Sequence, residues 1–201
     1  MTHSIRVWTP TLVATVLGAV SSGTMGWAQA AAPESDSAAP PAAHWVQRKL
    51  DYTYQGFTTH YTCDGLRDTV RDMLVALGAR KRDLQIQETG CTRFNGVEPF
   101  PGVKANFWVL EPVTANEAGQ GGDGKAQATQ WKTVDLVRLR ALVPDQGQCE
   151  LLEQLKKDAL PLFTSRNLNF HSTCVPHQIT LGDIQFTVDV LRPVPSAAPP
   201  A

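Results

Sequence analysis

Apolar residues recur at helical spacing in two stretches of the chain. Because an α-helix has about 3.6 residues per turn, positions three and four apart share one face. Asp64 can cap the start of the first helix, and Gly78 can end it in a left-handed turn. Pro161 lies in the second stretch, where a helix kinks or stops. The expected buried positions are Leu66, Val70, Met73, Leu74 and Leu77 in the first helix and Leu152, Leu155, Ala159 and Leu162 in the second.

Extended segments flank each predicted helix. Residues 49–62, rich in Tyr, Thr and Phe, precede the first helix, and residues 131–143 precede the second. A short strand is expected after each helix, over 83–88 and 167–173. A longer strand with alternating apolar residues follows, through Phe107 and Val109 in the first half and through Phe186, Val188 and Val190 in the second. Each half is therefore predicted to be a βαββ unit.

The two halves share the same ordered features. Each has a cysteine before its helix and another after it, and each ends on the pattern V-L-x-P-V, at 109–113 and 190–194. Four features in the same order favour an internal duplication. The predicted class is α+β, with two similar βαββ halves that together have about six strands and two helices. Both helices are expected on one face of an antiparallel-rich sheet.

The length of the elements predicts how the four cysteines pair. A helix of about fifteen residues covers roughly 22 Å, and a returning strand of about eight residues covers roughly 26 Å. The two lengths cancel, so Cys91 returns to Cys63 and Cys174 returns to Cys149. We expect disulfides Cys63–Cys91 and Cys149–Cys174, each worth about 3 kcal/mol in the chain-entropy account.

The N-terminal residues have the features of a secretory signal peptide. Arg6 precedes an apolar stretch over residues 7–20, and Ala28-Gln29-Ala30 provides a small-x-small cleavage site. We expect cleavage between Ala30 and Ala31, and hence a periplasmic or secreted protein with no stable membrane span after signal removal. Residues 31–44 and 195–201 are rich in Pro and Ala and are expected to be disordered. The predicted domain is 45–194, with halves 45–113 and 131–194 joined by the Gly-rich loop 114–130.

Composition excludes several classes of protein. Of the 201 residues, 42% are hydrophobic and 18% are charged, which is too apolar for a wholly disordered chain. A net charge of −1 gives no general electrostatic attraction to nucleic acid, so no nucleic-acid partner is expected. Four cysteines are too few for a disulfide-dense miniprotein. An exported globular domain remains.

Histidines next to cysteines raise the question of a metal site. The run from His171 to His177 reads H-x-x-C-x-x-H, and His60 precedes Cys63 with the same H-x-x-C spacing. Imidazole and thiolate are ligands that zinc and copper prefer. Oxidised cysteines offer no thiolate, so we assign no metal and keep His60, His171 and His177 as the candidate ligands.

Known catalytic and nucleotide-binding motifs are not recognisable. Gly119 to Gly124 matches G-x-G-x-x-G in letters, but it lies in a stretch of small residues rather than between a strand and a helix. No G-x-S-x-G or C-x-x-C motif occurs. The catalytic residues stay unknown, and no cofactor is assigned.

Three functions remain for such a chain. We expect a non-catalytic binding or interaction module with a protein or small-molecule partner in the cell envelope. The first alternative is an enzyme, hydrolase-like or other, with a site between the two halves. The second is a metal-binding protein that uses the histidines.

Overall fold

In the part of the chain that the structure describes, six strands form two antiparallel three-stranded sheets. The computed structural model describes residues 40–92, 96–113, 125–139, 148–175 and 183–195. In spatial order the first sheet contains β1 (Ala43–Thr53), β3 (Gly102–Pro112) and β2 (Gln85–Thr89), and the second contains β4 (Thr129–Asp135), β6 (Ile184–Pro193) and β5 (Ser165–Ser172). The α+β class and the antiparallel pairing are confirmed.

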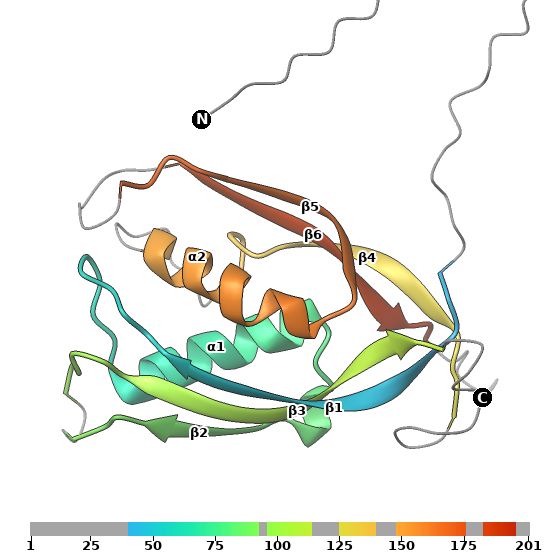
Figure 1. The fold of residues 1–201 in the computed structure, drawn as a ribbon, viewed down its shortest axis with the longest axis horizontal. Coiled ribbons are helices and arrows are strands. Elements are labelled where there is room, and N and C mark those ends of the chain that lie inside the picture. Colours follow the sequence, from blue (N-terminus) through green and yellow to red (C-terminus); the bar gives the residue numbers. More distant parts are fainter. Residues whose placement is uncertain (1–39, 93–95, 114–124, 140–147, 176–182, 196–201) are drawn as a thin grey trace, which may run out of the picture. The chain divides into compact units, whose positions relative to one another are not determined.

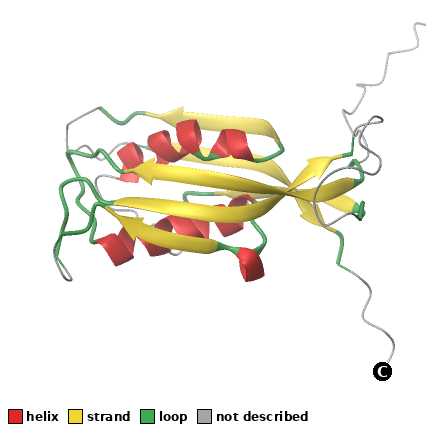
Figure 2. Cartoon of the chain, turned by 60° about the horizontal axis from the view of Figure 1, so that its bottom comes forward, coloured by secondary structure: helices red, strands yellow, loops and turns green. Residues whose placement is uncertain are grey.

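The sheets meet at one end, where β1 and β4 begin (Figure 2). Ala43 and Gln127 exchange two backbone hydrogen bonds there, with N···O distances of 3.0 and 2.8 Å. Ala43, Leu110 and Leu191 are buried together at this junction, with Trp45 and Trp131 packed against them. The prediction of a single sheet is therefore wrong. Pairing between β1 and β4 stops after one bridge, and the strands then separate into two sheets.

Both helices lie between the two sheets (Figure 1). The N-cap of helix α1 (Cys63–Leu77) is Thr62, whose hydroxyl accepts a hydrogen bond from the Gly65 amide. The predicted cap, Asp64, lies inside the helix. It ends at Gly78, which has a φ of 120° and donates its amide to the Leu74 carbonyl. This glycine ends the helix as predicted.

Helix α2 (Gln148–Asp158) stops before Pro161, which lies in a 3₁₀ turn over Leu160–Leu162. The predicted apolar faces are confirmed, because the expected residues of α1 are buried, as are Leu152, Leu155 and Ala159. Leu162 is only partly buried. These residues belong to one hydrophobic core that includes strands of both sheets and both helices.

One disulfide ties each helix start to a later segment of the same half. Cys63 is bonded to Cys91 and Cys149 to Cys174, with Cα–Cα distances of 6.2 and 6.0 Å. This is the pairing that the element lengths predict. No helix among the described residues is long and apolar enough to cross a membrane.

The first strand ends earlier than predicted, because the residues after it dock on α2. Strand β1 ends at Thr53, and the Glu150 carboxylate of α2 accepts hydrogen bonds from the amides of Phe57 and Thr58 at 2.8 and 3.2 Å. Gln154 accepts one from the Gln55 amide at 3.1 Å. These long-range bonds favour a loop over residues whose own propensity favours a strand.

Domain boundaries differ slightly from the prediction. Ala43 and His44 belong to β1 and are buried, so ordered structure begins before residue 45. Strand β4 begins at Thr129, inside the predicted Gly-rich connection. The predicted signal peptide, residues 114–124 of the predicted Gly-rich loop and the tail residues 196–201 lie outside the described residues. Strand order and direction are the same in both halves, but the duplication itself stays a prediction.

All three tyrosines of the chain contribute phenol groups to the shared core or its margin. The Tyr52 hydroxyl donates to Gln154 at 3.2 Å, and the rings of Tyr54 and Tyr61 pack edge to face at 5.0 Å. Burial raises the pKa of Tyr61 to about 12 and raises the pKa of Tyr52 and of Tyr54 further. A buried phenol resists ionisation because the apolar surroundings disfavour its anion.

We therefore expect the free energy of unfolding to fall as the pH rises above 10. The unfolded chain loses the phenol protons near pH 10 and the folded chain keeps them, so each tyrosine removes up to about 1.4 kcal/mol per pH unit. The three together give about 4 kcal/mol per pH unit at most. Urea unfolding between pH 9 and 11.5 measures this slope. Tyr61→Phe should reduce it by about one third, and an unchanged slope in that variant would contradict the assignment.

Candidate functional site

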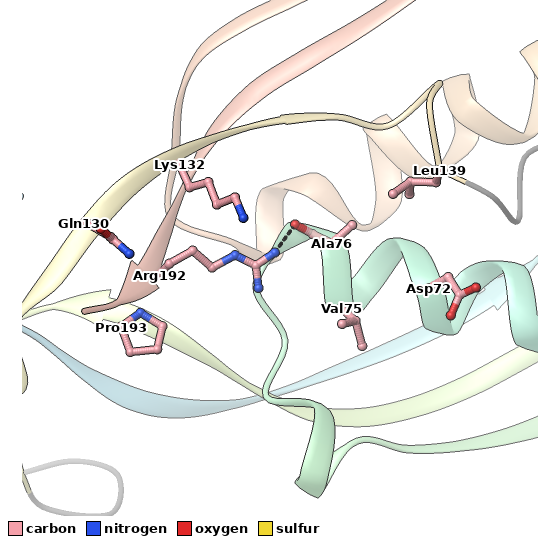
Figure 3. A pocket seen from close by; sticks show the side chains of 8 residues that line it. All are labelled: Asp72, Val75, Ala76, Gln130, Lys132, Leu139, Arg192 and Pro193. Atoms are coloured by element: carbon pink, nitrogen blue, oxygen red, sulfur yellow. Dashed lines mark hydrogen bonds between the residues drawn. The ribbon is translucent and has the colours of Figure 1, made fainter. Parts of the chain in front are cut away.

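A pocket of about 630 Å³ opens between α1 and the second sheet (Figure 3). Its volume is in the range of small-molecule sites in proteins. The walls come from the last two turns of α1, from β4 and β6, and from the segment after β4. The lining residues are Asp72, Val75, Ala76, Gln130, Lys132, Leu139, Arg192 and Pro193.

Polar side chains occupy the core-facing side of the second sheet at this pocket. Side chains of a strand alternate between faces, and Arg192 shares a face with the buried Val188 and Val190. Lys132 is paired with Val190 and therefore lies on the same face. Two cationic side chains thus occupy positions at which the alternation along these strands predicts apolar residues. Such departures from local rules are concentrated at functional sites.

Arg192 is anchored on the C-terminal end of α1. Its guanidinium donates a hydrogen bond to the Ala76 carbonyl, and the last turn of α1 contains no basic residue of its own. The carbonyl end of a helix attracts a cation, so this contact holds Arg192 in place. Burial lowers the pKa of the Arg192 guanidinium, which nevertheless stays charged at neutral pH. The hydrogen bond to Ala76 uses one of its five N–H donors.

The first sheet shows how a matching position is neutralised. Glu111 of β3 and Arg192 of β6 occupy equivalent positions in the two sheets. Each directly follows the leucine that pairs with the tryptophan of its own sheet's first strand. Glu111 forms an ion pair with Arg48 of β1. In β4 the position equivalent to Arg48 of β1, three residues after the tryptophan, is occupied by Val134. Valine carries no charge, so β4 offers no partner of this kind.

Within the described residues, the pocket cations have no carboxylate partner. No ion pair joins Lys132 or Arg192 to an acidic group in that part of the chain. Asp72 is the acidic residue of the lining, and it lies apart from both cations, with Val75 and Ala76 between them (Figure 3). The pocket therefore has positive charge at one end, negative charge at the other and apolar side chains between.

Two of the three metal-ligand candidates predicted from the sequence lie among the described residues, on different elements. His60 and His171 are both exposed, on the loop before α1 and on β5. His177 lies outside the described residues, as does the glycine-rich run 119–124. The Glu88 carboxylate lies within 4.8 Å of the sulfurs of Cys63 and Cys91, but these sulfurs form a disulfide and offer no thiolate ligand.

The outer face of the first sheet carries two tryptophans, Trp45 and Trp108. The guanidinium of Arg80 lies between them, 4.9 Å from the ring centroid of Trp45 and 5.2 Å from that of Trp108. Arg80 also forms an ion pair with Asp83 at 2.5 Å. The two rings are therefore covered by a cation rather than presented as an open aromatic patch.

Comparison of the chain with protein-family models, with curated proteins and with solved structures found no match. Sequence reasoning missed the pocket. The sequence does contain one indication of it, because Arg192 continues the alternation of the buried residues Val188 and Val190. A charged residue at such a position departs from the expected core pattern.

The anchoring of Arg192 predicts a difference between the two pocket cations. Arg192→Met removes a charge-assisted hydrogen bond and leaves the Ala76 carbonyl unpaired, so it should lower the free energy of unfolding by about 1 to 2 kcal/mol. The matched change Lys132→Met, at an exposed position, should alter it by less than about 0.5 kcal/mol. Urea denaturation of both variants tests this. Equal effects would show that Arg192 does not stabilise the helix end.

Proposed function

We propose that this chain is an exported, non-catalytic binding protein whose ligand occupies the pocket between α1, β4 and β6. The observation that carries the proposal is the placement of Lys132 and Arg192 on a core-facing sheet surface, without a carboxylate partner in the described residues. Cations in a concave, partly apolar site are well suited to fix the orientation of a small molecule.

Binding fits the lining better than catalysis does. The eight lining residues include no cysteine, serine or histidine, which are common nucleophiles and general bases. Asp72 and the two cations are at separate ends of the pocket, so they do not form the close acid–base pair that proton transfer requires (Figure 3). An enzyme with its site between the halves remains the alternative that a turnover test decides.

Export is part of the proposal. The signal-like N-terminal sequence predicts secretion, and two disulfides fit an oxidising compartment. A partner would then be met in the periplasm or outside the cell. Metal binding has less support, because all four cysteines are oxidised.

A ¹⁵N NMR titration with a panel of amino acids, short peptides, dicarboxylates, phosphates and sugars tests the proposal. At least one class should shift the amide signals of Ala76, Lys132 and Arg192 in a saturable way, and the ligand's own spectrum should stay unchanged for hours. Arg192→Met should abolish the shifts, while Lys49→Met on the outer face should preserve them.

Two results would overturn the proposal. Conversion of a panel member to a product would indicate an enzyme. Shifts confined to the outer face of the first sheet, or no shifts with any class, would mean that the pocket is not the binding site.

A further inference from the structure

The two ends of the pocket carry opposite charge, and this pattern restricts the ligand. Lys132 and Arg192 lie together at the end formed by the strands, and Asp72 lies one helical turn before Ala76 on α1 (Figure 3). Val75 and Leu139 contribute apolar surface to the lining. A ligand complementary to this lining has an anionic group, a short uncharged body and a cationic group.

The spacing follows from the helix. Arg192 is held at the Ala76 carbonyl, and Asp72 precedes Ala76 by four residues. Four residues of helix rise about 6 Å, and the side chains at both ends extend this to on the order of 6 to 10 Å. An extended peptide covers roughly 3.5 Å per residue, so the termini of a dipeptide or tripeptide match this separation.

The chemistry of each end agrees with peptide termini. A guanidinium presents parallel N–H donors that a carboxylate accepts in bidentate fashion, and the adjacent Lys132 adds a second positive charge. Asp72 is exposed, and its carboxylate has the acceptor oxygens that an ammonium group requires.

We propose that the pocket binds the free termini of a dipeptide or tripeptide, with the C-terminal carboxylate on Arg192 and Lys132 and the N-terminal ammonium at Asp72. This inference rests on the proposed binding function and specifies its ligand. Affinity depends mainly on the carboxylate end, because Arg192 is part-buried and Asp72 is exposed.

A length series tests the spacing by calorimetric and NMR titration of the disulfide-bonded protein. Alanine, Ala-Ala, Ala-Ala-Ala and tetra-alanine are the probes, and Ala-Ala or Ala-Ala-Ala should bind most tightly. Amidation of the C-terminus of Ala-Ala should weaken binding at least about tenfold, through loss of charge-assisted bonds. N-acetylation should weaken it about two- to fivefold, as expected for an exposed ion pair.

Variants assign each end. Asp72→Asn should bind Ala-Ala and N-acetyl-Ala-Ala equally, because this variant lacks the carboxylate that attracts the free N-terminal ammonium. The control Asp68→Asn, one turn earlier on α1 and outside the lining, should keep the wild-type preference. Arg192→Lys should retain part of the affinity that Arg192→Met loses.

The outcomes separate the two proposals. If another class in the panel shifts the pocket amides but no alanine peptide does, the peptide inference is overturned and the binding function stands. If affinity does not change with peptide length or with either terminal block, the charge spacing is irrelevant and the inference is also overturned. If nothing shifts the pocket signals, both proposals fail.

Discussion

A single hydrophobic core shared by both halves is the constraint on which the rest of the structure depends. Three strands and one short helix bury little apolar surface by themselves, whereas here residues of both helices and both sheets pack into one cluster. The sheets are joined at one end through Ala43 and Gln127, and the helices fill the space beyond. Hydrogen bonds from the loop after β1 to Glu150 and Gln154 of α2 link the halves again. Each half therefore completes the burial of the other.

The pocket follows from a local departure from this arrangement. Near the junction, the inner face of the second sheet changes from valines to Lys132 and Arg192, and the end of α1 lies opposite. In the first sheet the corresponding cation and carboxylate, Arg48 and Glu111, neutralise one another. The halves thus share a topology and differ in charge at matching positions. We take this difference as the functional signal, because fold alone does not determine function.

Local features of the fold were predictable from the sequence, and long-range ones were not. Helix α1 was predictable because its apolar spacing and Gly78 act within one segment, and the disulfides followed from element lengths. The end of β1 was not, because the loop after it is held by Glu150, more than ninety residues later. The separation into two sheets depends on how many residues of β1 and β4 pair with each other. The spacing of hydrophobic residues along the sequence does not indicate this number. The pocket combines α1 with β4 and β6, so its residues come together only in the folded chain.

Grafting the charge pair of the first half onto the second half tests the central claim most directly. The double change Val134→Arg and Arg192→Glu places a cation and a carboxylate where Arg48 and Glu111 stand in the first sheet. Titration of this variant with Ala-Ala should give no binding at concentrations that saturate the wild-type protein, while its circular dichroism stays native. Binding of Ala-Ala by the folded variant with wild-type affinity would contradict the account.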